Sequence, residues 1–600
     1  MTVPAVYSLL VHPQSPRPEQ TRPADGLVTT RALVIAVLAA TIVGAGLRFP
    51  YLASPELWVD ESCTWYFVCQ ASPFDFRTPH LLYENASRLY YMLLAGWTTV
   101  FGETPWGLRS FSAVLGTLTI PLMALWLRSV AGNAPAALGA ALAAVHPLHV
   151  YYSREARFYP LWMIELIGLL WCGWLAARTD RWRYWVGYAA LALAAMWTHY
   201  FTLFLAPATL ILPWAGRAPR LRWRRWLLTN AVVAAVFAPW FVAVVVPVSG
   251  RGNADWVAAY FRGYPPAAAI PRTLGAMAPA GFYPPYMGYL YRVSRGMVPA
   301  SVLGVASLIA AAVVFCVPGK RRLSLLPLPG RAFHVSCAIA PLALAWAYSM
   351  IRAPVYVVAR YDQVAWPAVM LILSVGLVEL GRRIRDGAVG IWITATCALL
   401  AGSAISVLVP FGAGTSPGYR QALIRYLAVN YRPGDRVVAF GMTRWDLCYY
   451  RAALWPDAPP FESFPASLEE QVGWISPRRQ LADRTALHRE AVARAQELRE
   501  AMRPGSTIWI LLGAYDLSLG RKDPAFQVDF ALDQALDAAG AVDRPTDPNL
   551  PLFARRWPTR GGAPQTCPAG SRVLEGSSTS AGAVDCPGQA PRTGRPIVSG

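Results

Sequence analysis

Charged residues are scarce in this chain of 600 residues: they make up 15% of it, whereas 55% of the residues are hydrophobic. Typical soluble domains contain roughly 25% charged residues, and their apolar residues alternate with polar ones. Here the apolar residues form long uninterrupted runs, which is typical of a chain that crosses a bilayer many times. The composition therefore excludes an ordinary soluble protein.

The sequence also lacks a disulfide framework, because most of its nine cysteines are scattered singly. Cys567 and Cys586 both lie in the tail, and an external disulfide between them is an alternative that the sequence leaves open. The first apolar run follows a leader of thirty residues and lacks a cleavage site of small residues. It therefore reads as a retained membrane anchor and not as a cleaved signal peptide.

Eleven apolar runs are long enough to cross a membrane, for which roughly 17 to 25 residues are needed. The predicted spans are 31–50, 109–127, 135–151, 158–177, 184–199, 200–215, 226–248, 297–318, 333–351, 362–381 and 388–410. Residues 89–101 are also apolar, but a span there would reverse every later loop against the arginine pattern. We interpret them as a juxtamembrane helix.

The arginines predict the orientation, because cationic loops stay on the cytoplasmic side. They cluster in alternate connections, which places the N-terminus inside and everything after about residue 411 outside the plasma (inner) membrane. The net charge of +20 then serves topology, and no nucleic-acid partner is expected. The clusters are Arg128; Arg178, Arg181 and Arg183; Arg217, Arg220, Arg222, Arg224 and Arg225; Lys320, Arg321, Arg322 and Arg331; and Arg382, Arg383 and Arg385.

The composition changes after residue 411, where Gly and Pro interrupt charged amphipathic runs. Residues 481–502 read as a helix, and residues 436–440 and 507–512 read as strands. The predicted fold is an all-α polytopic membrane protein with a small C-terminal extracytoplasmic α/β domain. Its parts are a disordered cytoplasmic leader (1–30), a transmembrane domain (31–410) with a first external loop (51–108), an external α/β domain (411–556) and a disordered tail (557–600).

Two adjacent carboxylates, Asp60 and Glu61, lie in the first external loop just beyond the first span. Carboxylates this close repel one another, and partial burial favours the protonated form of at least one of them. Such a group can accept a proton during catalysis. An exposed acidic loop is the alternative interpretation.

A second group of polar residues occupies the turn at residues 151–158, between two apolar runs. Glu155 and Arg157 place a carboxylate and a guanidinium at the predicted mouth of the bundle, and a guanidinium binds phosphate through paired hydrogen bonds. An interfacial belt of Tyr and Arg is the alternative. Arg360, at the outer start of the tenth run, is either a second phosphate contact or a side chain that reaches the membrane surface.

The order and spacing of these motifs resemble the GT-C superfamily of membrane glycosyltransferases. The likeness is greatest to bacterial relatives of dolichyl-phosphate-mannose protein mannosyltransferases, to the lipid A aminoarabinose transferase and to rhizobial lipopolysaccharide galacturonosyltransferases. It extends over residues 31–380. The matching segments are Leu47-Arg48-Phe49 through Leu57-Trp58-Val59-Asp60-Glu61-Ser62, Tyr83-Glu84 to Trp97, Tyr151-Tyr152-Ser153-Arg154-Glu155-Ala156-Arg157, and Arg360-Tyr361 with Trp366-Pro367.

This resemblance implies a GT-C-like fold of about eleven transmembrane helices and a mannosyltransferase-like reaction. It also implies that Asp60 is the catalytic base, with Glu61 as its companion. The implied phosphate-binding or donor-binding residues are Arg157, Glu155, Arg360, Tyr361, Tyr152 and Arg88.

Glu84 occupies the place of an acidic residue that helps some relatives to hold a divalent metal ion, and His199 is a second candidate ligand. Relatives usually continue with Lys-Pro or His-Pro-Pro, whereas this chain has Asn85-Ala86-Ser87-Arg88. The resemblance therefore leaves the metal open, and Arg88 is either a replacement cation or a surface charge. His199 has a structural interpretation as well.

The implied chemistry starts from a polyprenyl-phosphate-linked sugar, whose anomeric bond is already activated, so no nucleotide is expected. The enzyme has to deprotonate an acceptor hydroxyl and stabilise the departing lipid phosphate, with inversion at the anomeric carbon. The acceptor would be an envelope glycan, lipid or protein on the outer face. A transporter or flippase of lipid-linked glycans is the alternative, although the ionisable residues lie mostly at loop ends and Glu165 is the only clear candidate in the middle of a span.

Overall fold

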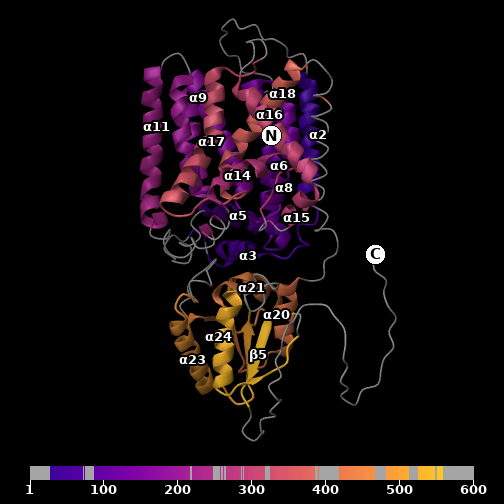
Figure 1. The fold of residues 1–600 in the computed structure, drawn as a ribbon, viewed down its shortest axis with the longest axis vertical. Helices are drawn as coiled ribbons and strands as arrows, with labels where there is room; N and C mark the ends of the chain where they lie inside the picture. Colours follow the sequence, from indigo (N-terminus) through magenta and orange to yellow (C-terminus); the bar gives the residue numbers. More distant parts are fainter. Residues whose placement is uncertain are drawn as a thin grey trace, which may run out of the picture.

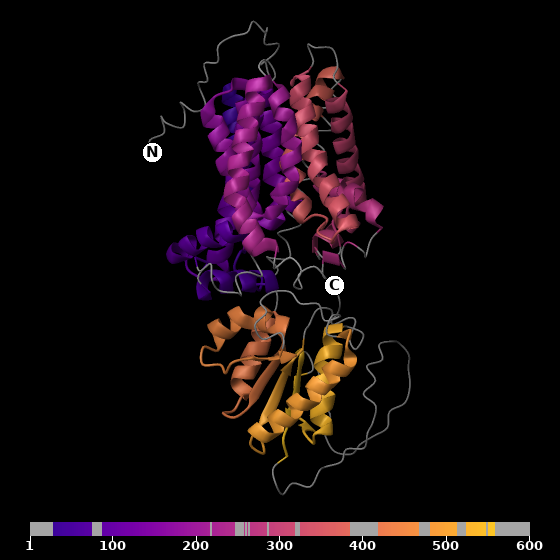
Figure 2. The same ribbon diagram turned by 90° about the vertical axis from the view of Figure 1, so that its left-hand side faces the viewer.

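The computed structural model describes residues 28–71, 73–74, 87–215, 219–246, 257–258, 261, 265–284, 287, 289–317, 324–384, 390, 418–466, 481–512, 524–547 and 550–558. A helical bundle forms one end of the molecule and a mixed α/β region forms the other, with α3 between them (Figure 1). The turned view separates the same two parts (Figure 2).

Seven helices among the described residues are long and apolar enough to cross a membrane, so the chain is a multi-pass membrane protein. Their ends follow local signals: Thr104 caps α6 by accepting from the amide of Gly107, and Gly132, at φ 91°, ends the helix in a conformation that suits glycine. The seven long helices are α2 (Thr30–Arg48), α6 (Pro105–Ala131), α9 (Tyr159–Thr179), α11 (Pro219–Trp240), α16 (Val298–Cys316), α17 (Leu328–Ile351) and α18 (Trp366–Arg383).

Shorter elements join these helices or pack among them. They are α3 (Val59–Trp65), η1 (Tyr66–Gln70), α5 (Arg88–Phe101), α7 (Asn133–Val145), α8 (Pro147–Ser153), α10 (Trp182–Thr198), η3 (Tyr200–Ala215), η4 (Phe241–Val245), η5 (Pro266–Ala268), α14 (Ala269–Met277), α15 (Tyr289–Gly296) and η8 (Tyr361–Ala365).

The predicted count of eleven spans stays a prediction. The run at 135–151 divides into α7 and α8 at His146, whose backbone is extended and precedes Pro147. The 13 residues of α7 rise only about 20 Å. The runs at 184–199 and 200–215 form α10 and η3, and the run at 388–410 lies outside the described residues apart from Gly390.

The segment 89–101 forms α5, a helix of 14 residues. At 1.5 Å per residue it rises roughly 21 Å, less than the roughly 30 Å of a hydrocarbon core. It lies at the end of the bundle that faces the α/β region, near α3 (Figures 1 and 2). Its length therefore favours the juxtamembrane interpretation.

The C-terminal region is built on a five-stranded sheet in the order β2-β1-β3-β5-β4. The strands β1 and β3 occupy residues 436–440 and 507–511, and α23 lies within residues 481–502, so these three predictions are confirmed. The elements are α20 (Tyr419–Asn430), β1 (Arg436–Phe440), α21 (Gly441–Leu454), β2 (Glu462–Phe464), α23 (Arg484–Ala501), β3 (Thr507–Leu511), α24 (Pro524–Ala538), β4 (Val542–Asp543) and β5 (Leu552–Arg556).

The central strands β1 and β3 are buried on both faces, whereas the edge strand β4 is exposed. The strands β1, β2 and β3 are parallel, whereas β5 is antiparallel to β3. Val438 and Ile510 on one face pack with residues of α23 and α24. Val437 and Trp509 on the other face belong to a hydrophobic core that continues through α20 and α21 into the membrane bundle.

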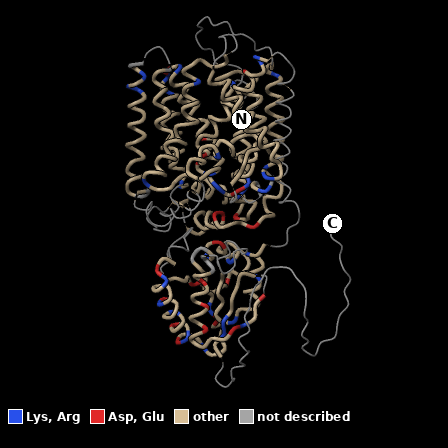
Figure 3. Tube along the Cα trace, viewed as in Figure 1, with Lys and Arg blue, Asp and Glu red and all other residues tan. Residues whose placement is uncertain are grey.

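Charged residues are sparse along the middle of the bundle and collect at its two ends (Figure 3). The end away from the sheet is marked mainly by Lys and Arg, whereas acidic residues appear beside basic ones at the end near α3 (Figure 3). In the predicted orientation this arginine-rich end faces the cytoplasm.

This orientation can be tested with single cysteines at Ser54, Thr179 and Ala453, three exposed positions, in a chain whose reactive native cysteines have been replaced. An impermeant maleimide should label the first and third in intact cells, because both would lie outside. The second should react only after permeabilisation. Labelling of Thr179→Cys in intact cells would contradict the predicted orientation and indicate the opposite one.

Candidate active site

The site is centred on the carboxylate of Asp60, in the first turn of α3. Its Oδ2 atom contacts the Nη2 atom of Arg360, 300 residues away in the sequence, and lies 3.8 Å from Nη2 of Arg157. The side chains of Arg157 and Arg360 are 5% and 12% exposed, and that of Asp60 is 21% exposed. Two guanidinium groups from distant turns thus converge on one carboxylate oxygen that water can still reach.

Arg360 is held in place by several neighbours. Its Nε atom donates to the hydroxyl of Tyr159 at 2.9 Å. Its backbone turn is fixed by two contacts to Ala359, whose φ is 60°: Tyr152 donates to the Ala359 carbonyl at 2.8 Å, and the Ala359 amide donates to Asp362 at 2.8 Å. The structure thus gives Tyr152 a role in supporting the Arg360 turn.

Arg157 approaches Asp60 from the turn before α9. Its Nη1 atom donates to the Asp60 carbonyl at 3.3 Å and to the Thr64 hydroxyl at 3.4 Å, so it contacts both the backbone and the side chains of α3. Its own carbonyl accepts from Ser112 at 3.0 Å. These contacts join α3, α6 and the turn into one unit.

Glu61 faces away from this cluster and pairs with Arg109, which the sequence analysis missed. Its oxygens accept from Nε and Nη2 of Arg109 at 2.7 and 2.5 Å and from the Ala156 amide at 2.9 Å. Both side chains are almost fully buried. With its oxygens engaged in this way, Glu61 is better suited to holding α3 than to chemistry.

Glu155 is half-buried, and its buried Oε2 atom has no hydrogen-bond partner among the described residues. Burial raises the pKa of its carboxyl to about 8, and the negative charges of Glu61 and Asp60 act in the same direction. The group is therefore mostly protonated at neutral pH. A neutral Glu155 can lie near a phosphate without repelling it.

His199 is enclosed by aromatic rings, with ring centroids at 4.8 Å from those of Phe158, Trp162 and Tyr361. Burial and the neighbouring guanidinium groups of Arg157 and Arg360 lower its pKa to about 3. The same cations would repel a divalent metal ion, so His199 does not suit a metal site. Tyr361 contributes to this enclosure.

Arg88 and Glu84, the remaining predicted site residues, lie next to or within a segment that the structure does not describe. Arg88 begins α5, donates to the Pro73 carbonyl at 3.1 Å and lies over the ring of Trp240. Glu84 falls outside the described residues. Within the part that the structure describes, no three His, Cys, Asp or Glu side chains gather as metal ligands.

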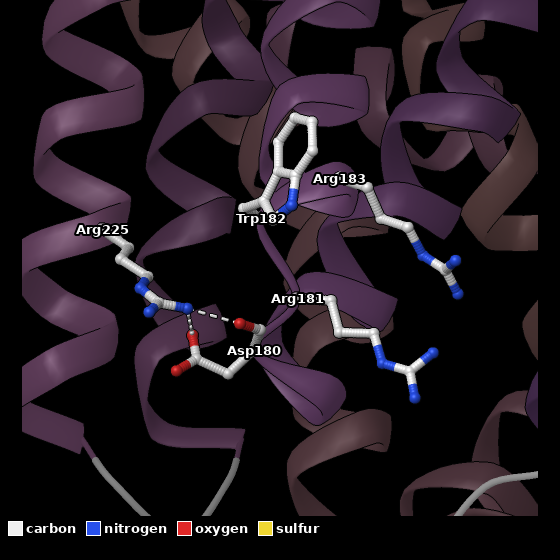
Figure 4. A pocket seen from close by; sticks show the side chains of 5 residues that line it. All are labelled: Asp180, Arg181, Trp182, Arg183 and Arg225. Atoms are coloured by element: carbon white, nitrogen blue, oxygen red, sulfur yellow. Dashed lines mark hydrogen bonds and ion pairs between the residues drawn. The ribbon is translucent and has the colours of Figure 1, made fainter.

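A separate cavity of about 430 Å³ lies far from Asp60 and is lined by Asp180, Arg181, Trp182, Arg183 and Arg225. Arg225 forms an ion pair with Asp180 at 3.0 Å, while Arg181 and Arg183 extend to the other side (Figure 4). The 21 residues of α9 separate it from Tyr159, a rise of roughly 30 Å. This cavity belongs to the arginine-rich end and not to the Asp60 site.

Residues 87–243 match the family described as dolichyl-phosphate-mannose-protein mannosyltransferase. This segment makes up about a quarter of the chain, which is therefore similar to that family over this part of its length. The matched segment includes Arg109, Glu155, Arg157 and His199 but begins after Asp60 and ends before Arg360.

Several solved structures are similar at low identity. ArnT from Cupriavidus metallidurans, in the apo state and bound to undecaprenyl phosphate, shares 14% identity over 88% of this chain and 98% of its own, with TM-scores of 0.41 and 0.40. The mycobacterial arabinofuranosyltransferase AftD (mutant R1389S) shares 14% identity over 89% of this chain and 42% of its own, with a TM-score of 0.49. No curated protein matches in sequence. At these scores the structural likenesses carry no argument about this chain.

The Glu61–Arg109 pair should be a major source of stability at the site. Arg109→Met keeps an unbranched apolar side chain but leaves a buried carboxylate without its cation, which costs about 3–5 kcal/mol. We expect the purified variant to unfold at a clearly lower temperature than the parent, whereas Arg181→Met, exposed at the far end of the bundle, should not. Equal melting of the two variants would show that the pair contributes little.

Proposed function

We propose that this protein is a membrane glycosyltransferase, which transfers a sugar from a polyprenyl phosphate to a hydroxyl group of an envelope glycan, lipid or protein on the outer face of the plasma membrane. One observation carries the proposal: a single oxygen of Asp60 faces both Arg157 and Arg360. A base and the two cations that stabilise a leaving phosphate are the groups that this reaction requires.

The roles follow from the geometry and charges. In the proposed reaction Arg157 and Arg360 bind the phosphate of the donor, which competes with Asp60 for the two guanidinium groups. Asp60 is then free to accept the proton of the acceptor hydroxyl as the acceptor oxygen attacks the anomeric carbon. The bond from that carbon to the phosphate oxygen breaks, which gives inversion and releases the lipid phosphate.

The rest of the site supports this assignment. Tyr159 and Tyr152 hold Arg360 in place, and the neutral Glu155 adds no negative charge beside the phosphate. The family that residues 87–243 match is described by a dolichyl-phosphate-linked sugar, and we propose a lipid phosphate of that class as the donor carrier here. The reaction as proposed needs no step through a metal ion.

The decisive variant is Asp60→Asn, which keeps the shape of the side chain but removes its basicity. A deletion strain complemented with this variant should lack the same envelope product that the deletion lacks, because loss of a general base lowers turnover roughly 100-fold to 10,000-fold. Mass spectrometry of envelope glycans, lipids and proteins measures the product.

Asp180→Asn, at the far end of the bundle, is the matched control and should restore the product. The purified Asp60→Asn protein should still bind undecaprenyl phosphate, since Arg157 and Arg360 remain. Product formation by the Asp60→Asn strain at the parental level would overturn the proposed role of Asp60.

Glu155 makes the reaction sensitive to alkaline pH. Because its pKa is raised to about 8, a rise in pH through 8 ionises it and places a negative charge beside the donor phosphate. Transfer by the parent should therefore decline above pH 8, while Glu155→Gln, which is neutral at every pH, should keep its activity. Initial rates from pH 6 to pH 9.5 measure this, and an unchanged alkaline decline in Glu155→Gln would rule Glu155 out.

A further inference from the structure

The C-terminal α/β region contacts the chain segment that carries Asp60. The amide of Leu57, two residues before α3, donates to the hydroxyl of Tyr450 at 2.6 Å. Within α3, the hydroxyl of Ser62 donates to the carbonyl of Asp446 at 3.3 Å. Both partners lie on α21, which packs alongside α3 in the views of the fold (Figure 1).

Aromatic side chains extend this contact along α3 and into η1. The ring of Trp65 meets that of Tyr449 edge to face at 5.4 Å, and the ring of Tyr66 meets that of Trp445 at 4.6 Å. Aromatic pairs in this geometry contribute about 0.5–1.5 kcal/mol each beyond the area that they bury. The contact is therefore both apolar and hydrogen-bonded.

Arg420 joins the two sides electrostatically. Its Nη1 atom lies 3.4 Å from Oε2 of Glu56, just before α3, and its Nε atom lies 2.9 Å from Oδ2 of Asp446 on α21. Glu56 also accepts from the amide of Gln421 at 2.8 Å. The side chains of Arg420, Glu56 and Asp446 are 17%, 8% and 11% exposed, which makes their pairing stronger than that of surface ions.

The fit at this point is close. A Cβ atom on Gly418, which precedes α20, would lie 2.1 Å from Cδ of Glu56. The first residues of the C-terminal region thus pack directly against the loop before α3. A side chain at this position would require the Glu56 carboxylate to move.

The helix α3 has seven residues, too few to be stable alone. Its position must come from the contacts on its sides. Toward the bundle it is held by Glu61 with Arg109 and by Asp60 with Arg157 and Arg360. Toward the C-terminal region it is held by α21 and Arg420.

We propose that the C-terminal region is a positioning part of the active site, in which Arg420 pairs with Glu56 and Asp446 and thereby fixes α3 so that Asp60 faces Arg157 and Arg360. Arg420 is a positioning residue and does not touch the substrate. The effect on transfer rests on the proposed function, whereas the effect on α3 does not. A region that only recruited an acceptor would leave the order of α3 unchanged when Arg420 is lost.

The experiment compares Arg420→Ala with Arg436→Ala in the full-length purified protein. Arg436 is the matched control because it forms an ion pair with Glu462 in the same region, is 46% exposed and lies on β1. Hydrogen exchange of amides 57–66 should speed up at least tenfold in Arg420→Ala, since their protection depends on local contacts. Exchange in β1 and β3 should match the parent, and Arg436→Ala should match it throughout.

A second set of measurements determines turnover and the affinity for undecaprenyl phosphate separately. Product formation by Arg420→Ala should fall by about 100-fold, the loss expected when a base is displaced by about 1 Å. Affinity for undecaprenyl phosphate should be unchanged, because Arg157 and Arg360 are intact. Arg420→Lys keeps the positive charge but has a single ammonium group, which cannot pair with Glu56 and Asp446 in the way that a guanidinium does. This variant should recover part of the turnover.

Parental exchange of amides 57–66 in Arg420→Ala would overturn the inference whatever the activity, and so would faster exchange with parental turnover. Should Arg420→Ala unfold β1 and β3, Glu56→Gln, which removes the charge on the other side of the contact, replaces it under the same criteria. Asp60→Asn is measured in parallel. Its parental activity would overturn the proposed function, while the exchange result would still decide whether Arg420 holds α3.

Discussion

The buried pair between Glu61 and Arg109 is the interaction on which the arrangement of the site depends. A guanidinium that leaves water needs compensation for its lost hydration, and Arg109 finds it in the Glu61 carboxylate and in the carbonyls of Leu52, Pro55 and Glu56. It therefore connects α6 with the loop and with α3. Glu61 in turn accepts from the Ala156 amide, which fixes the turn that carries Arg157. The neighbouring Asp60 is thus directed toward the two arginines without taking part in this pair.

Much of the fold follows from the sequence because its strongest patterns are periodic. The pattern of hydrophobic residues predicts three kinds of element. They are the long apolar runs, the two buried parallel strands and the amphipathic helix of residues 484–501. The ends and divisions of the spans depend instead on single residues, such as Pro147, whose ring separates α7 from α8. The short strands β2 and β4, of three and two residues, carry too little pattern to be recognised.

Only those site residues could be predicted that are charged and stand in loops next to apolar runs. Asp60, Arg157 and Arg360 stand out beside apolar runs, and the structure brings them together. Arg109 was hidden at the start of a predicted span, and Tyr159 and Asp362 lie in similar settings. A signal for Arg109 does exist: it is an arginine at the predicted outer end of a span, against the usual placement of cations. Arg48 has the same placement and is also buried, with hydrogen bonds to Ser153 and His149. An arginine on the outer side needs a partner within the protein, and that requirement points to a packed polar site.

The charges of the site explain how one arrangement can serve both steps of the proposed reaction. Glu61 and Arg109 neutralise each other, and Glu155 is protonated at neutral pH, so Asp60 faces two guanidinium groups with one positive charge left over. That excess suits a sugar phosphodiester, which carries a single negative charge. When the sugar leaves, the lipid phosphate gains negative charge while Asp60 becomes neutral by accepting the proton of the acceptor. Because the Asp60 carboxylate has then lost its negative charge, the positive charges of Arg157 and Arg360 act on the phosphate alone as its negative charge increases. Negative charge therefore passes from the base to the leaving group within one pair of arginines, and the positive groups need not move for the transition state to be stabilised.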